Sequence, residues 1–167
     1  MAIPVAQLGW MAGVVDLKGK VIRKQNKMRR TPQVVLIVES RHLAVIKELG
    51  RLTGTRAEAV KKAPSTDWYR RNCQEHCEDA HVHVVAPEWP ATSRWTATGA
   101  SMGVVLYNLQ PFLRVDQGWD LMMEEAYEST ALSGQGSGAA LMGVRRLRDL
   151  GWEMPPEITG FLALEED

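Results

Sequence analysis

The chain has no long apolar run, only two cysteines among its 167 residues, and few acidic residues in its first 63 positions. It contains no stretch of about 18 apolar residues, so we expect no membrane-spanning helix and no membrane partner. Residues 1–15 carry no basic region and no small-residue cleavage site, which argues against a secretory signal peptide. Two cysteines are too few for a disulfide framework, and we therefore expect a cytoplasmic protein.

The formal net charge of zero hides a strong asymmetry along the chain. Residues 1–63 carry 13 Lys and Arg against 4 Asp and Glu, whereas residues 64–167 carry 7 against 16. Residues 18–30 hold seven basic side chains and no acidic one. Such a basic segment is typical of a protein that binds a polyanion, although a solvated basic hairpin without a partner is the alternative. The acidic C-terminal half is a candidate surface for a protein partner.

Apolar periodicity and turn residues predict an α+β fold with an antiparallel sheet. The first part should form a helix, two strands and a helix, over residues 4–15, 20–27, 33–39 and 41–49. Ser40 would cap the second helix, Gly50 or Gly54 would end it, and Gly19 would end the first helix with a positive φ. Because Pro4–Val15 is apolar nearly all round, we expect the first helix to be buried.

The rest of the sheet and three more helices should follow. We expect strands near residues 56–62 and 92–97, then helices from 99 or 101 to 109, from 116 or 120 to 129, and over 139–150. The order α-β-β-α-β-β-α-α divides the chain into a domain over 1–130, with an irregular insertion at 64–90, and a remainder over 131–167. That remainder consists of a glycine-rich linker, one helix and an acidic tail.

Two stretches resemble the LAGLIDADG homing endonucleases. Residues 11–19, MAGVVDLKG, match the nine-residue family motif at Ala12, Gly13, Asp16 and Gly19. Residues 106–113, LYNLQPFL, are similar to the segment where the family's third helix ends, and the resemblance spans about residues 5–130. It implies an αββαββα saddle whose concave sheet face lies in the major groove of double-stranded DNA.

For a single-motif chain, the resemblance also implies a homodimer. Two motif helices pack together in the family through small residues, which are Gly9, Ala12 and Gly13 in this chain. Small side chains at helical spacing let a second backbone approach closely, which is the physical requirement of such an interface.

The chain departs from the family at the eighth motif position. The family has its metal-binding acid there, and this chain has Lys18, whose ammonium cannot ligate Mg²⁺. We therefore expect no catalytic Mg²⁺ and no cleavage. Asp16 is retained but points away from position 18 by roughly 200° on a helix. Asp116 stands where family members often carry a basic residue, so we hypothesise a Lys18–Asp116 ion pair, against the alternative of two unrelated surface charges.

The sequence thus predicts a non-cleaving, sequence-specific binder of double-stranded DNA, derived from a homing endonuclease of a phage or mobile element. A phage-encoded chain would act in the cytoplasm of its bacterial host. The alternatives are an active metal-dependent endonuclease that uses other acids, and a protein-interaction module that does not bind DNA. Only every second residue of a strand can face DNA, and the sequence does not fix which half does so. The candidate DNA contacts are Lys18, Lys20, Arg23, Lys24, Gln25, Asn26, Lys27, Arg29 and Arg30.

Both cysteines and three of the four histidines lie within 11 residues of the insertion. Thiolate and imidazole at this density favour a structural Zn²⁺ site with four ligands. We expect Cys73, Cys77, His81 and His83 to bind it, with His76 as the alternative for either imidazole. A disulfide, an ordinary loop without metal, and a catalytic zinc are the other interpretations.

Overall fold

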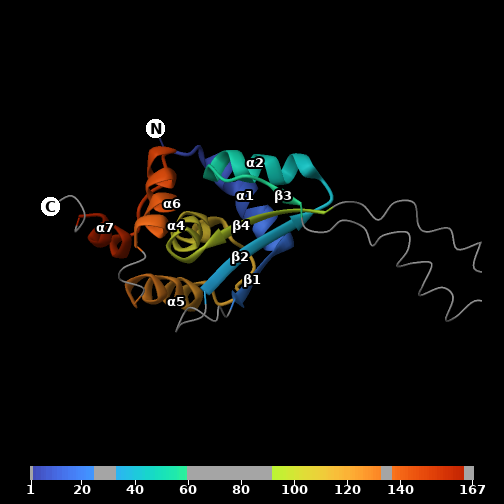
Figure 1. The fold of residues 1–167 in the computed structure, drawn as a ribbon. Helices are drawn as coiled ribbons and strands as arrows, with labels where there is room; N and C mark the ends of the chain where they lie inside the picture. The colour runs from blue at the N-terminus through green and yellow to red at the C-terminus, as the bar shows by residue number, and fades with distance from the viewer. Residues whose placement is uncertain (1, 25–32, 60–91, 133–136, 164–167) are drawn as a thin grey trace, which may run out of the picture.

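The structure is a computed structural model, and it describes residues 2–24, 33–59, 92–132 and 137–163 (Figure 1). The elements follow one another in the order predicted for an αββαββα domain and continue with further helices. They are α1 (Val5–Lys18), β1 (Gly19–Lys24), β2 (Gln33–Ser40), α2 (Leu43–Thr53), β3 (Glu58–Ala59), β4 (Ser93–Thr98), α4 (Gly99–Leu109), the 3-10 turn η1 (Gln110–Phe112), α5 (Trp119–Leu132), α6 (Ser137–Asp149) and α7 (Pro156–Ala163).

The strands form an antiparallel sheet in the order β1-β2-β4-β3, which confirms the predicted α+β fold. The β-branched run of β2 suits a central strand, and β2 pairs with β1 on one side and with β4 on the other. Leu36 stands opposite both Val21 of β1 and Ala97 of β4. This register fixes which side chains share a face of the sheet, because successive side chains of a strand point to opposite faces.

One face of the sheet and the helices enclose the core. Val34, Leu36 and Val38 of β2 belong to it, and α1, α2 and α4 all contact that strand. Trp95 of β4 is fully buried, and its indole N–H donates to the Thr53 hydroxyl at 2.8 Å. The polar edge of this large side chain is therefore satisfied inside the core, as burial requires.

The C-terminal helices α6 and α7 share the same core. Val144, Leu147 and Ile158 are buried in it, and Trp152 donates its indole N–H to the Leu52 carbonyl at 2.8 Å. The sequence predicted one helix and an acidic tail after residue 131, whereas the structure has a second helix, α7, at Pro156–Ala163. Proline at the first helical position suits a helix start, because the N–H that it lacks would have no partner within the helix.

Three local expectations need correction. Gly19 has an extended backbone with φ −72°. A Cβ there would lie 2.5 Å from the Val15 carbonyl oxygen, so close packing rather than a positive φ favours glycine. Ser40 does not cap α2, which begins at Leu43; its hydroxyl accepts the backbone N–H of His42 at 3.0 Å instead. Gly54, with φ 70°, ends α2 as predicted.

The third correction concerns α1, which we expected to be buried on all sides. Met11, Ala12 and Val15 are its buried residues, whereas Val5 is 67% exposed and Leu17 is 86% exposed. An apolar side of this helix therefore faces away from the chain's own core. Among the described residues, no helix is both long enough and apolar enough to cross a lipid bilayer.

Candidate nucleic-acid interface

The face of the sheet opposite the core helices combines basic, hydroxyl and apolar side chains. Strand alternation and the register place alternate residues of β1, β2 and β4 together on it. We call this surface the outer face. Its residues are Lys20, Ile22, Lys24, Val35, Ile37, Glu39, Glu58, Arg94, Thr96 and Thr98, of which Val35 and Ile37 are buried. Lysine, arginine and threonine side chains supply hydrogen-bond donors, and the two lysines are exposed.

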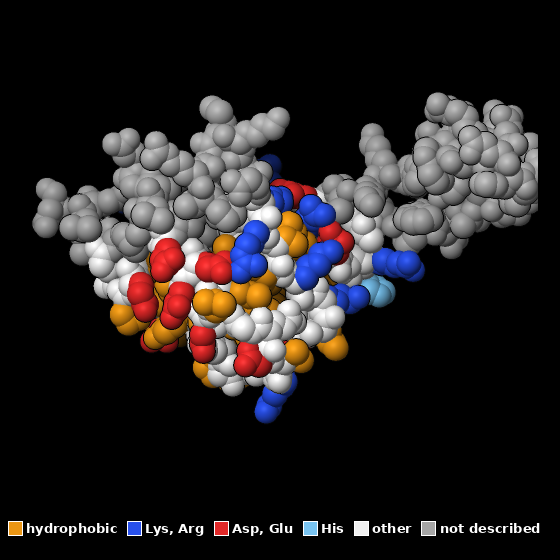
Figure 2. Space-filling model, turned by 90° about the horizontal axis from the view of Figure 1, so that it is seen from below, with side chains coloured by type: hydrophobic (Ala, Val, Ile, Leu, Met, Phe, Trp, Pro, Cys, Tyr) orange, Lys and Arg blue, Asp and Glu red, His pale blue; other side chains and the backbone are white. Residues whose placement is uncertain are grey.

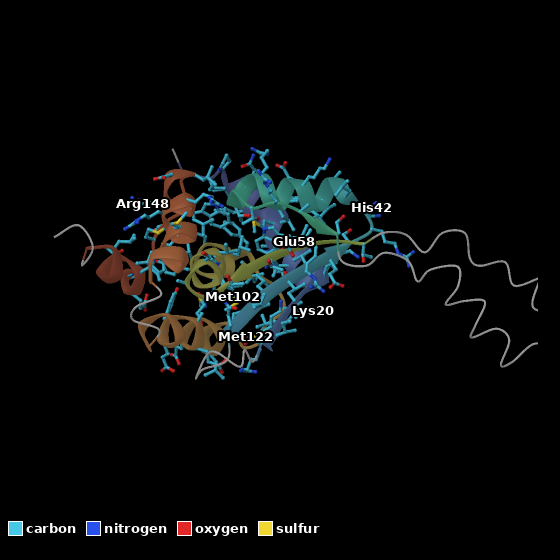
Figure 3. All side chains as sticks on the ribbon, in the orientation of Figure 1. Lys20, His42, Glu58, Met102, Met122 and Arg148 are labelled. Carbon is cyan, nitrogen blue, oxygen red and sulfur yellow. The ribbon has the colours of Figure 1, made fainter. Side chains whose placement is uncertain are left out.

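Glu39 joins three strands on the outer face. Its Oε1 accepts hydrogen bonds from Arg94 Nε at 3.1 Å and Nη2 at 2.6 Å, across the directly paired strands β2 and β4. Its Oε2 lies 3.8 Å from Lys20 Nζ on β1. The Arg94 and Glu39 side chains are each 28% exposed, so solvent screens this pair less than it screens a fully exposed ion pair. In Figure 3, Lys20 and Glu58 mark the β1 and β3 sides of the same sheet.

Arg23 points to the other side of β1. It stands opposite Val34, a core residue, and its Nε and Nη2 donate to the Glu125 carboxylate of α5 at 2.9 and 2.6 Å. The hydrogen bonds from Arg23 hold the pKa of Glu125 below its ordinary value of 4.5. Of the described candidate contacts on β1, Lys20 and Lys24 thus lie on the outer face, and Arg23 is paired with a helix.

The charge asymmetry along the chain is also visible on the surface. Figure 2 shows Asp and Glu side chains gathered at the left of the view and Lys and Arg side chains toward the centre and right. The helix α5 contributes exposed acids at Asp120, Glu124 and Glu128. The exposed acids of α5 therefore lie together, whereas Lys20 and Lys24 lie on the sheet and Arg23 and Glu125 join the two elements.

The two motif positions at the end of α1 have different environments. Both carboxylate oxygens of Asp16 accept backbone N–H groups, from Arg114 at 2.8 Å and from Val115 at 3.1 Å. These hydrogen bonds tie the end of α1 to the segment after η1. Lys18 is exposed and is the last residue of α1, where a cation interacts favourably with the helix dipole.

A catalytic divalent cation does not fit these residues. Asp16 is engaged by two donors, and Lys18 offers no acceptor. In the described ranges, no cluster of three or more His, Cys, Asp or Glu side chains could hold a metal ion. The hypothesised Lys18–Asp116 ion pair is also not formed among the described contacts. The Asp116 carboxylate instead accepts the backbone N–H of Gly118 at 2.8 Å.

The small residues predicted for a dimer interface separate into two groups. Ala12 is fully buried in the chain's own core. A Cβ at Gly9 or Gly13 would meet nothing within 4 Å, so both positions face open space. With Val5 and Leu17 they are spaced four residues apart along one side of α1. We call these four residues, Val5, Gly9, Gly13 and Leu17, the α1 strip.

Several predicted site residues lie outside the described residues. On the basic hairpin these are Gln25, Asn26, Lys27, Arg29 and Arg30, and in the insertion they are Cys73, His76, Cys77, His81 and His83. The zinc site therefore stays a prediction. Sequence reasoning also missed the Arg94–Glu39 pair. The predicted strands at 33–39 and 92–97 contained both residues, but their pairing register could not be deduced from the sequence.

No protein-family model matches the chain, and a search of curated proteins finds no match. Solved structures of similar fold include the homing endonuclease I-CvuI in complex with its target. The two chains are 14% identical, with a TM-score of 0.45, and the match covers 89% of this chain and 97% of the I-CvuI chain. The meganuclease I-SmaMI bound to uncleaveable DNA matches with a TM-score of 0.42 and 12% identity over 86% of this chain. The chain spans 43% of the I-SmaMI chain.

Proposed function

We propose that the chain is a sequence-specific, non-cleaving binder of double-stranded DNA that acts as a homodimer. The outer face of the sheet is the observation that carries this proposal. It presents Lys20, Lys24 and Arg94 together with two threonines on paired strands, and the predicted basic segment continues from the end of β1. Paired β-strands fit the major groove of B-form DNA, where these side-chain types contact phosphates and base edges.

The charges on this face suggest two different kinds of DNA contact. Lys24 is exposed near the end of the edge strand β1, a position suited to the phosphate backbone at the wall of the groove. Arg94 lies on the interior strand β4 beside Glu39, close to where the floor of the groove would lie. Apart from Glu125, which is paired with Arg23, α5 carries exposed acids at Asp120, Glu124 and Glu128, and these favour binding DNA with α5 turned away from it.

The absence of cleavage is supported by the end of α1. Hydrolysis in this class of site requires a carboxylate that holds a divalent cation near the scissile phosphate, as the resemblance implies. Lys18 stands at that position, and Asp16 uses both oxygens to hold the segment after η1. Lys18 can contact a phosphate as a cation, but it cannot activate water through a metal.

The homodimer is supported by the α1 strip. Its two glycines have no neighbour within 4 Å of a built Cβ, and Val5 and Leu17 expose apolar surface at its ends. Packing two copies of α1 along this strip would bury the exposed leucine and valine and bring two backbones close together. Two sheets related by a two-fold axis would then contact the two halves of a pseudo-palindromic site.

Selection of bound sequences from a random duplex DNA pool tests the proposal. We expect enrichment of a pseudo-palindromic sequence, and an affinity that falls steeply as salt rises because bound cations displace counterions from phosphates. The bound pool is then incubated with Mg²⁺ and analysed for strand breaks. Sequence-specific nicks would favour an active endonuclease. Absence of binding at low salt would favour a protein-interaction module.

A matched pair of variants shows which face binds. Lys20→Gln with Lys24→Gln removes two cations from the outer face, and we expect a clear loss of affinity for every sequence. Arg51→Gln is the control, because Arg51 lies on α2 and is paired with Glu48 at 2.6 Å. An equal loss of binding free energy per charge removed in both variants would show that a general charge effect, rather than the outer face, accounts for binding.

A further inference from the structure

The Arg94–Glu39 pair leaves one particular edge of the arginine available. Both hydrogen bonds to Glu39 Oε1 come from Nε and Nη2, which form the side edge of the planar guanidinium. Nη1 and the second hydrogen of Nη2 form the end edge, and among the described residues no acceptor takes either of them. Two parallel N–H donors at fixed spacing therefore remain on a guanidinium whose position the carboxylate sets.

From this geometry we propose that Arg94, positioned by Glu39, recognises a guanine in the major groove of the bound DNA. Guanine presents two acceptors there, N7 and O6, whose spacing suits two parallel N–H donors of one arginine. The inference rests on the proposed function, because the outer face must lie in the groove. It assigns to one residue of that face the selection of one base.

The location of the pair favours reading a base over holding a phosphate. β2 and β4 are the two interior strands of the sheet, whereas Lys20 and Lys24 belong to the edge strand β1. With the outer face docked in the groove as proposed, the interior strands would lie nearer the base edges and the edge strand β1 nearer the phosphates. Glu39 also neutralises the charge of Arg94, so the pair adds little to general attraction for phosphates.

Glu39 is a positioning residue in this proposal. A free arginine side chain must lose rotamer freedom when it binds a base, and that loss lowers affinity. Arg94 and Glu39 are each 28% exposed and are joined by two hydrogen bonds, so much of this freedom is already lost before DNA binds. The preference for guanine over the other bases should therefore depend on Glu39, which holds Arg94 in position.

The experiment is a selection of bound sequences from random duplex DNA with the full chain and three variants. For the wild-type chain we expect guanine at one position of each half-site, preferred over other bases by about tenfold or more. Arg94→Gln should replace this preference by adenine or abolish it, because glutamine pairs with adenine N6 and N7. Glu39→Gln should weaken the guanine preference at that position only.

Arg51→Gln is the matched control. Arg51 makes the same two-bond ion pair, through Nε at 2.9 Å and Nη2 at 2.6 Å to Glu48, but it lies on α2. It should leave all base preferences unchanged. If Arg94→Gln and Glu39→Gln lower binding equally for every sequence, the pair only supports the sheet and the proposal is overturned.

A modified base gives a test that needs no folded variant. Replacing the selected guanine by 7-deazaguanine removes the N7 acceptor and leaves base pairing intact. We expect the wild-type chain to lose affinity by about fivefold or more for this DNA, as for one base contact of a bidentate pair. If the chain binds the DNA with 7-deazaguanine as tightly as the unmodified DNA, Arg94 does not recognise guanine N7 and this inference is overturned. The proposed DNA binding would not be contradicted by that result. A wild-type chain that binds no duplex DNA overturns both the inference and the proposed function.

Discussion

The guanidinium of Arg23 and the carboxylate of Glu125 form an ion pair with two hydrogen bonds, although 102 positions separate them in the chain. The pair connects the end of β1 to α5. The next residue, Lys24, lies on the opposite face of the same strand and is exposed. Two adjacent basic residues of the segment 18–30 therefore have different roles, one within the fold and one on the outer face.

Neutralising these two residues separately should give different DNA affinities. Lys24→Gln should weaken binding to all sequences and reduce the slope of log affinity against log salt by about 1, as loss of one phosphate contact does. Arg23→Gln should leave that slope unchanged, because its guanidinium is paired with Glu125 on the helix side. Salt titrations of duplex DNA binding measure both slopes. An Arg23→Gln slope as low as that of Lys24→Gln would place Arg23 at the DNA.

The same pair predicts a pH dependence of stability. Arg23 lowers the pKa of Glu125 below 4.5, so the folded chain holds this carboxylate ionised more strongly than the unfolded chain does. The resulting stability is present above pH 4.5 and is lost as the pH falls through the lowered pKa. Glu125→Gln should therefore flatten the decline in stability below pH 4.5, measured by urea unfolding at a series of pH values.

Arg23→Gln is the companion variant for this pH experiment. It removes the same interaction from the other side, so it should flatten the acid limb to the same extent. The double variant should add little beyond either single change, since the two residues act through one contact. Additive effects would show that another group causes the pH dependence.

The elements that the sequence predicted well are those set by local pattern. The strand predicted at 33–39 is β2 at Gln33–Ser40, and Gly54 ends α2 because its positive φ suits glycine. What the sequence could not supply depends on distant contacts. The Arg94–Glu39 pair requires the register of β4 on β2, and the exposure of α1 depends on which of its apolar sides the core uses. Strand alternation predicted that only half of the basic residues of β1 face outward. The pairing of β1 with β2 then showed that Lys20 and Lys24 belong to that half.

Asp16 should prove to be a structural residue. Asparagine at this position keeps one oxygen acceptor but places an N–H₂ donor near a second backbone N–H. We expect Asp16→Asn to lower the free energy of unfolding by about 1–3 kcal/mol. Urea denaturation measures this, and Asp149→Asn, an exposed side chain at 74%, should change stability little. Full stability in Asp16→Asn together with a change in Mg²⁺ affinity would instead indicate a metal ligand.

The predicted zinc site can be tested on protein purified without a histidine tag. Elemental analysis should find about one Zn²⁺ per chain, since a structural site takes four ligands from one cluster. Cys73→Ser and Cys77→Ser should each release the metal, and comparing His76→Ala, His81→Ala and His83→Ala decides which two imidazoles bind. His42→Ala is the control, because this histidine precedes α2 and lies outside the cluster. A wild-type chain without stoichiometric zinc contradicts the site.

The α1 strip predicts opposite effects of one substitution on folding and on association. In the single chain, a Cβ at Gly13 meets nothing within 4 Å, so Gly13→Ala should stabilise α1 by up to about 1 kcal/mol through helix propensity. In a homodimer joined through the strip, the same methyl group would separate two closely packed backbones and raise the dissociation constant. Urea unfolding and sedimentation equilibrium measure the two effects.

Gly160→Ala is the matched control for that substitution. Gly160 lies on α7, and a Cβ there also meets nothing within 4 Å. It should stabilise its helix by a similar amount and leave the dissociation constant unchanged, because α7 is not part of the strip. If Gly13→Ala behaves as Gly160→Ala does, or if the wild-type chain is monomeric at the concentrations where it binds DNA, the strip is not the dimer interface. Gly13→Leu should weaken association more than Gly13→Ala does, because a larger side chain keeps the two helix backbones further apart.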